Sequence, residues 1–172
     1  NLINDVLDLS KIEANRLELD PADFDLQTTV EDVCELLAPR AHEKDIDLVV
    51  FVEPVLRRVV VGDELRFRQV LTNLVGNALK FTPAGGRVAL RTQGTDGRLI
   101  ISVADSGPGI PSEDRSRAVE PFVRLSNAPP RDGSGLGLNL AAAVARLHGG
   151  SLRLEDNDPG LVARLDLPVG AP

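Results

Sequence analysis

Hydrophobic residues recur along this chain at two spacings, which predict helices and strands in alternation. Spacings of three to four residues predict helices over 1–19, about 27–43, 70–82 and 136–149. Runs rich in β-branched residues predict strands at 47–52, 57–63, 86–94, 97–105, 151–156 and 161–168. Asp63 is a candidate N-cap for the third helix, and a glycine-flanked turn at 95–96 predicts a hairpin.

The strands outnumber the connections that helices can provide, so most neighbouring strands must be antiparallel. We therefore predict an α+β fold: a two-layer α/β sandwich whose mixed, mostly antiparallel sheet carries helices on one face. One N-terminal helix precedes this domain.

The N-terminal helix is too apolar to be stable alone. Leu2, Val6, Leu9 and Leu17 fall along one side of it. The helix either packs on its own domain or forms half of a helical hairpin whose other helix is missing. Pro21 breaks the helical pattern and favours the hairpin. We therefore divide the chain into a hairpin segment at 1–20 and a second domain at 21–172.

Composition limits the function. The chain has 172 residues, and its net charge of −7 argues against a nucleic-acid surface. The single cysteine, Cys34, cannot form an internal disulfide, which favours a reducing, cytoplasmic compartment. No apolar run is long enough to span a membrane, and we expect no direct membrane contact. The absence of methionine leads us to expect that the chain is cut from a longer protein.

Two amides and an ammonium interrupt the third predicted helix. Asn73 and Asn77 lie four residues apart on one face, and Lys80 lies close to the same face. Asparagine is a mediocre helix former, so a stability argument alone does not explain the pair. Mg²⁺ beside a triphosphate needs few, hard oxygen ligands, and an amide supplies one without adding negative charge. The pattern therefore predicts a site for metal and phosphate, with Lys80 as a compensating charge.

Two glycine-rich loops complete the predicted site. "DSGPGIP" (105–111) follows a strand, and the Asp105 carboxylate can accept a hydrogen bond from the exocyclic amine of adenine. Guanine has a carbonyl there and would be repelled. "DGSGLGL" (132–138) opens a helix, whose N-terminal N–H groups suit phosphates. Each loop alone is a weak signal, but together with the asparagine helix they predict Mg-ATP.

These motifs resemble those of the sensor histidine kinases. "NLVGNALKFTP" is similar to their N box, "DSGPGI" to the first glycine box, "EPFVR" (120–124) to the F box and "GSGLGL" to the second glycine box. "VLDLSKIEANRLELDPADFDL" is similar to the end of the dimerisation helix and its linker, so the resemblance covers nearly the whole chain. It implies the Bergerat-type ATP-binding fold shared with gyrase, the large heat-shock chaperone and the mismatch-repair ATPases.

The resemblance also implies roles for single residues. Asn77 would coordinate Mg²⁺, Asn73 and Lys80 would lie near the phosphates, and Asp105 would recognise adenine. Phe122 would anchor a mobile lid at about 111–132, and Arg124 could reach the terminal phosphate. The remaining implied nucleotide contacts are Phe81, Gly107, Gly109, Ile110, Gly133, Gly135, Leu136, Gly137 and Leu138.

Plainer roles stay open for three of these residues. Asn73 could merely form a hydrogen bond to a ligand of the metal, without contacting the metal itself. Phe122 could be a core residue, and Arg124 could form a surface ion pair.

The histidine that would accept the phosphoryl group is not among those present. In the family it lies upstream of the "DLSKIEA" segment and is followed at short range by a proline. His42 lies after that segment and lacks the proline, and His148 lies at a helix end, so both are expected to be structural. We therefore expect a chain that binds Mg-ATP but cannot autophosphorylate.

In the full-length kinase, the resemblance implies a homodimer formed by the dimerisation helices, and a response-regulator receiver domain as partner. The alternatives are a regulatory module that has lost catalysis, or a related ATPase or serine kinase of the same fold. The parent is expected in the cytoplasm or as the cytosolic part of a membrane-anchored sensor.

Overall fold

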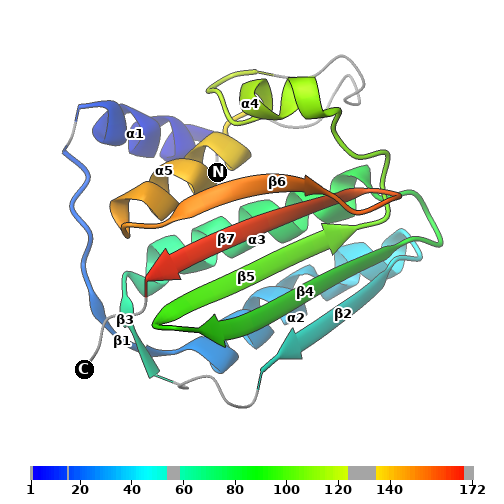
Figure 1. The fold of residues 1–172 in the computed structure, drawn as a ribbon, viewed down its shortest axis with the longest axis horizontal. Helices are drawn as coiled ribbons and strands as arrows, with labels where there is room; N and C mark the ends of the chain where they lie inside the picture. The colour runs from blue at the N-terminus through cyan, green and yellow to red at the C-terminus, as the bar shows by residue number, and fades with distance from the viewer. Residues whose placement is uncertain (1, 15, 54–58, 124–134, 169–172) are drawn as a thin grey trace.

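The fold is a mixed five-stranded sheet with helices packed on one of its faces. The structure is a computed structural model and describes residues 2–14, 16–53, 59–123 and 135–168. The sheet has the order β2 (Asp47–Val52), β4 (Arg87–Thr95), β5 (Arg98–Asp105), β7 (Leu161–Pro168) and β6 (Ser151–Asp156). Behind it lie α2 (Leu26–Glu43), α3 (Glu64–Phe81) and α5 (Gly137–Leu147), as Figure 1 shows. The predicted fold class is confirmed.

Strand pairing is antiparallel except at one edge. β2 pairs in parallel with β4, and the other three pairs in the large sheet are antiparallel. The predicted hairpin joins β4 and β5, where Asp96 and Gly97 adopt φ values of 46° and 75°. Such left-handed pairs match the twist of adjoining strands. A separate two-stranded sheet joins β1 (Ala22–Asp25) to β3 (Val59–Gly62).

The core lies between the helices and the inward-facing residues of the sheet. Alternate residues of β4 and β5 are buried, as the period of two for a half-covered sheet requires. The helices contribute matching stripes. The fully buried large side chains include Leu26, Val30, Val70, Leu71, Leu74, Val75, Leu90, Leu99, Ile101, Leu140 and Leu165. Burial of these stripes decides which side of each helix faces away from the sheet.

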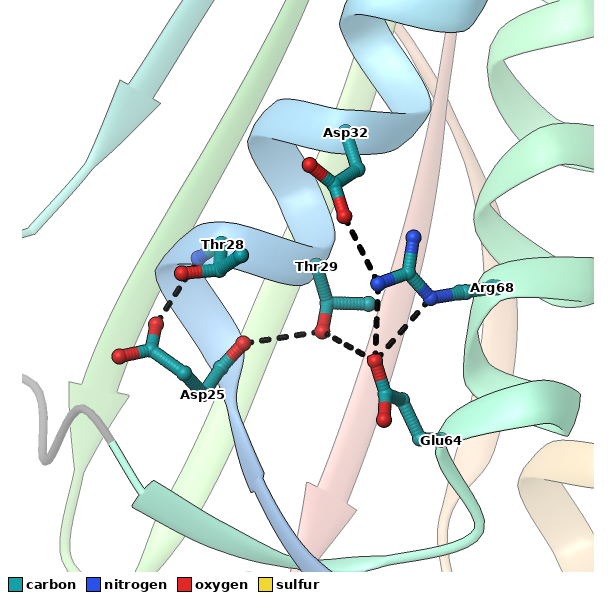
Figure 2. Close-up of polar contacts among 6 residues, drawn as sticks. All are labelled: Asp25, Thr28, Thr29, Asp32, Glu64 and Arg68. Carbon is teal, nitrogen blue, oxygen red and sulfur yellow. Dashed lines mark hydrogen bonds and ion pairs between the residues drawn. The ribbon is translucent and has the colours of Figure 1, made fainter.

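The helix α2 begins at a side-chain cap. Asp25 Oδ1 accepts a hydrogen bond from the Thr28 backbone N–H at 2.9 Å, and the Thr29 hydroxyl donates to the Asp25 backbone oxygen at 2.9 Å (Figure 2). These bonds satisfy groups that have no partner within the helix. The structure therefore confirms the predicted second helix.

A polar network joins the first turns of α2 and α3. Thr29 Oγ1 lies 3.2 Å from Glu64 Oε1, and Arg68 lies between Glu64 at 2.9 Å and Asp32 at 2.8 Å (Figure 2). The two acidic partners raise the pKa of Arg68 through these hydrogen bonds, so its charge is held in place. The network fixes how α3 begins relative to α2.

The N-terminal helix is shorter than predicted. α1 spans Leu2–Glu13, whereas the periodicity predicted helix to residue 19. The Arg16 and Leu17 backbone N–H groups both donate to the Lys11 oxygen, which closes the helix. Leu17 is then buried, and the Asp20 N–H donates to Asp63 Oδ2 at 3.2 Å. Tertiary contacts of the linker thus override the continued apolar spacing. The strand β1 was not predicted.

The helix α1 lies on its own domain, beside α5 and the start of α3. Asp8 is buried and bonds Arg66 Nη1 at 2.5 Å and Gln69 Nε2 at 3.0 Å. Burial opposes ionisation of Asp8, but these two partners outweigh it and lower its pKa. Ile3 and Leu7 remain exposed on the other side, and the hairpin stays a prediction. None of the described helices combines the length and apolarity needed to cross a bilayer.

The Asp25→Ala substitution removes the cap of α2 and should lower the free energy of unfolding by about 1 kcal/mol. The matched control is Asp23→Ala, because Asp23 is exposed on the same strand. Urea denaturation of both variants checks this prediction. Equal stability of the two variants would contradict the role of the Asp25 carboxylate.

Candidate nucleotide-binding site

The two asparagines of α3 face the beginning of α5. A Cβ placed on Gly137 would lie 3.4 Å from Asn77 Nδ2 and 3.5 Å from Asn73 Cγ. The Asn73 amide nitrogen is buried and has no hydrogen-bond partner in the described part of the chain. A buried amide without a partner is costly, so this group suits a polar ligand. The predicted juxtaposition of the asparagine helix and the second glycine box is therefore present.

The orientation of α3 follows from its cap and its apolar stripe. Asp63 Oδ1 accepts a hydrogen bond from the Arg66 N–H at 3.0 Å, which confirms the predicted N-cap. The buried stripe packs toward the sheet and α2, and leaves Asn73, Asn77 and Lys80 only partly buried. Lys80 Nζ lies 4.9 Å from the centroid of the Phe81 ring, which is within cation–π range.

A lysine from α2's C-cap holds the other end of α3. Lys44 Nζ donates hydrogen bonds to the backbone oxygens of Leu79, Lys80 and Thr82, at 2.6, 3.0 and 2.9 Å. These oxygens lie at the negative end of the helix dipole, where an ammonium is favourable. Lys44 thus sets the position of the chain just where Lys80 and Phe81 leave the helix. No local pattern in the sequence marks Lys44 for this role.

Asp105 ends β5 with a buried carboxylate. Its Oδ1 accepts hydrogen bonds from the Gly107 N–H at 2.8 Å and the Leu161 N–H at 3.3 Å. Burial raises the pKa of Asp105, although these two backbone bonds act in the opposite direction. Oδ2 receives no hydrogen bond from any described residue. One oxygen is therefore held by the backbone while the other can accept a bond from a ligand.

The first glycine box passes very close to two other backbone segments. A Cβ on Gly107 would lie 2.9 Å from the Phe81 oxygen, at the end of α3. Gly109 has a φ of +71°, and its Cβ would lie 2.8 Å from the Gly160 oxygen. Larger residues at these positions would force the segments apart. Gly107 therefore lets the loop after Asp105 approach the C-terminal end of α3.

The N-terminus of α5 begins without a side-chain cap from its N-cap residue. That residue is Leu136, which makes no side-chain cap hydrogen bond. Gly135 has a φ of +73°, and a Cβ there would lie 2.9 Å from the Val123 oxygen. Leu136 is buried, and Leu138 packs against the core, so the first turn is firmly seated. Its N–H groups and dipole favour a phosphate in front of Asn73 and Asn77.

The structure describes only some of the residues predicted for the lid and its contacts. Phe122 is 62% exposed, with a φ of 62°, so the prediction that it anchors the lid on the core is wrong for this structure. The Ile110 backbone oxygen accepts a hydrogen bond from Arg115 Nε at 2.9 Å. Arg124 and Gly133 lie outside the described residues.

In this fold, two amides of α3 face the first turn of α5, and a buried carboxylate ends β5. Residues 62–171 match the family model described as histidine kinase-, DNA gyrase B- and HSP90-like ATPase. The chain belongs to this family.

Three proteins to which the chain is similar are histidine kinases. Histidine protein kinase DivJ of Caulobacter vibrioides is 42% identical over 171 residues, which cover 98% of this chain and 28% of DivJ. The structure of full-length ShkA in complex with AMPPNP has a TM-score of 0.88 and 36% identity, over 99% of this chain and 36% of ShkA.

A third structure, of histidine kinase ThkA in complex with the response regulator protein TrrA, has a TM-score of 0.78 and 25% identity, over 98% of this chain and 48% of ThkA. The chain thus spans less than half the length of each of these three proteins. The resemblance to sensor histidine kinases is confirmed.

Replacing Asp105 by Asn tests how burial of the carboxylate affects the stability of the fold. Because burial raises the pKa of Asp105 above its unfolded value, the ionised carboxylate lowers the free energy of unfolding at neutral pH. This cost disappears as the pH falls through the raised pKa. Asn keeps an oxygen for the Gly107 and Leu161 N–H groups, so Asp105→Asn should be at least as stable as the unaltered chain at pH 7.

Urea denaturation of both proteins as a function of pH checks this expectation. The stability advantage of Asp105→Asn should shrink in acid. The control is Asp105→Ala, which leaves both N–H groups without their acceptor and should be destabilised by about 1–3 kcal/mol. A less stable Asp105→Asn at pH 7 would contradict the effect of burial.

Proposed function

We propose that this chain is the ATP-binding catalytic domain of a sensor histidine kinase, with residues 1–20 as the end of a dimerisation hairpin and 21–172 as the catalytic domain. The observation that carries the proposal is the facing arrangement of Asn73, Asn77 and Gly137, together with the Asn73 amide nitrogen, which is buried and has no hydrogen-bond partner among the described residues. A triphosphate with its metal would supply polar partners for this partly buried face.

The amide oxygens suit Mg²⁺ in its nucleotide complex. Asn77 would supply one hard oxygen ligand, and the phosphates and water would supply the others. When bound, the ion neutralises charge on the phosphates. Asn73 would hold a phosphate oxygen or a ligand of the metal through its buried Nδ2, and Lys80 would add positive charge at the helix end. The α5 N–H groups would orient the phosphate chain.

The buried carboxylate supplies base specificity. Oδ2 of Asp105 is left for the exocyclic amine of adenine, because Oδ1 is occupied by two backbone N–H groups. Guanine presents a carbonyl oxygen at the corresponding place, which the carboxylate would repel. The close approach of Gly107 and Gly109 to their neighbours leaves no side chain between the base and the backbone.

The phosphoryl acceptor is proposed to lie outside this chain. His148 is held between the Val144 oxygen, 2.9 Å from Nδ1, and the Asp63 N–H, which donates to Nε2 at 3.3 Å. That bonding is structural and uses both ring nitrogens. His42 is exposed on α2, in the helix layer that packs behind the sheet. The γ-phosphoryl group of ATP would thus go to a histidine on the dimerisation helix of the full-length protein.

The remaining partners follow from the relatives. ThkA was solved with a response regulator, so a receiver domain with a phosphate-accepting aspartate is the proposed next partner. The dimerisation helices would make the full-length protein a homodimer. We place the domain in the cytoplasm, where ATP and a receiver domain are both present.

Calorimetric titration should show that Mg-ATP binds and Mg-GTP binds at least about tenfold more weakly. Asn77→Asp adds negative charge beside the phosphates and should weaken Mg-ATP binding by about tenfold or more. The matched control is Asn4→Asp, an exposed change on α1 that should leave binding intact. If the folded, unaltered chain binds neither nucleotide, the result contradicts the proposed function.

Adding back the upstream helix tests the chemistry. The present chain should take up no label from ATP labelled at the γ-phosphate, whereas the extended protein should form an acid-labile phosphohistidine. Asn77→Asp in the extended protein should abolish labelling. Nucleotide binding without labelling of the extended protein would instead support a regulatory module that has lost catalysis.

A further inference from the structure

The turn between β6 and β7 forms hydrogen bonds with the end of β5, on the side of β5 opposite β4. Asn157 Nδ2 donates a hydrogen bond to the Asp105 backbone oxygen at 2.7 Å, and the Leu161 N–H reaches Asp105 Oδ1 at 3.3 Å. The turn closes on itself through the Asn157 N–H, which donates to the Gly160 oxygen at 3.3 Å. Both the main chain and the side chain of Asp105 are therefore held from this turn.

The sheet alone does not fix Asp105 on that side. The pairing of β5 with β7 ends at Ala104 opposite Val162, whereas the pairing with β4 continues to Asp105 opposite Val88. Without the turn, the Asp105 oxygen would have no partner toward β7 among the described residues. Asn157 thus replaces the next ladder bond, and it does so with a side chain rather than a backbone group.

Close packing confirms how tightly the turn is seated. A Cβ on Gly160 would lie only 1.7 Å from the Asp105 oxygen, so residue 160 must be glycine for the two backbones to meet. The Gly160 oxygen in turn lies against Gly109, at the other end of the first glycine box. The turn therefore contacts the predicted adenine loop at both of its ends.

An arginine extends the same contact to α4 (Arg115–Ala118). Arg115 donates through Nε to the Ile110 oxygen at 2.9 Å and forms an ion pair with Asp156, the last residue of β6. The Arg115 side chain is mostly buried, although Asp156 is exposed. The end of the glycine loop and the start of α4 are thus fixed to the same turn.

We infer that the β6–β7 turn is a positioning element for adenine recognition, with Asn157 as its principal positioning residue. The inference rests on the proposed function, since it concerns how Asp105 is aimed at the adenine amine. Asn157 does not touch the nucleotide. It holds the Asp105 main chain so that Oδ2 stays directed away from the two N–H groups that occupy Oδ1.

A pair of nucleotides separates this role from general support of the fold. ADP carries the exocyclic amine that would donate a hydrogen bond to Asp105, whereas IDP has an oxygen in place of this amine. If the Asp105 carboxylate loses its fixed position, ADP binding should weaken more than IDP binding. If the whole fold is destabilised instead, the binding of both nucleotides should weaken to the same extent.

The experiment is calorimetric titration of Mg-ADP and Mg-IDP into the unaltered chain and into Asn157→Ala. Loss of this one hydrogen bond should weaken ADP binding by about tenfold, while IDP binding changes by less than about twofold. Asn157→Asp is a second, isosteric variant that lacks the donor and should behave in the same way. The control is Arg98→Gln, which breaks the Arg98–Asp166 pair at the far end of β5 and should change neither affinity.

The outcomes are distinct. An unchanged ratio of ADP to IDP affinity in both Asn157 variants overturns the positioning role, whether both affinities fall together or neither changes. A folded, unaltered chain that binds neither nucleotide overturns the proposed function and this inference with it. A chain that prefers ADP, and loses that preference only when Asn157 is changed, supports both.

Discussion

The whole site depends on how α3 is buried. One side of this helix must pack against the sheet and α2, because its apolar stripe is too large to leave in water. That burial turns Asn73 and Asn77 toward the first turn of α5, where the proposed phosphate site lies. The placement of the polar groups is therefore a consequence of hydrophobic packing on the opposite side of the same helix.

Contacts with the backbone then fix the loops and helix ends that hydrophobic packing brings close together. Lys44 holds the last carbonyls of α3, and Gly107 lets the loop after β5 approach Phe81. Gly109 and Gly160 allow a similar approach to the β6–β7 turn. Contacts of this kind leave little freedom for Asp105, whose burial raises its pKa. A carboxylate held in this way is suited to recognition, at a cost to stability in the absence of a ligand.

Much of this could be predicted from local patterns. The helices α2, α3 and α5 and all five strands of the large sheet lie where their periodicity places them. Among the motif residues, Asn73 and Asn77 lie against Gly137, and Gly107, which binds Asp105, lies against the end of α3 at Phe81. Two predictions were wrong. The helix α1 ends early because Leu17 and Asp20 contact the domain, and the Phe122 side chain is exposed rather than packed on the core.

The sequence by itself determined the class of fold and which residues are candidates for the site, because periodicity and spaced polar motifs are local properties of the chain. Only the tertiary structure decided which groups support that site. Lys44 is about 35 residues from the carbonyls it binds, and Asn157 is 52 residues from Asp105. No local pattern marks either residue, because a hydrogen bond to a distant backbone oxygen requires only that the fold bring the two together.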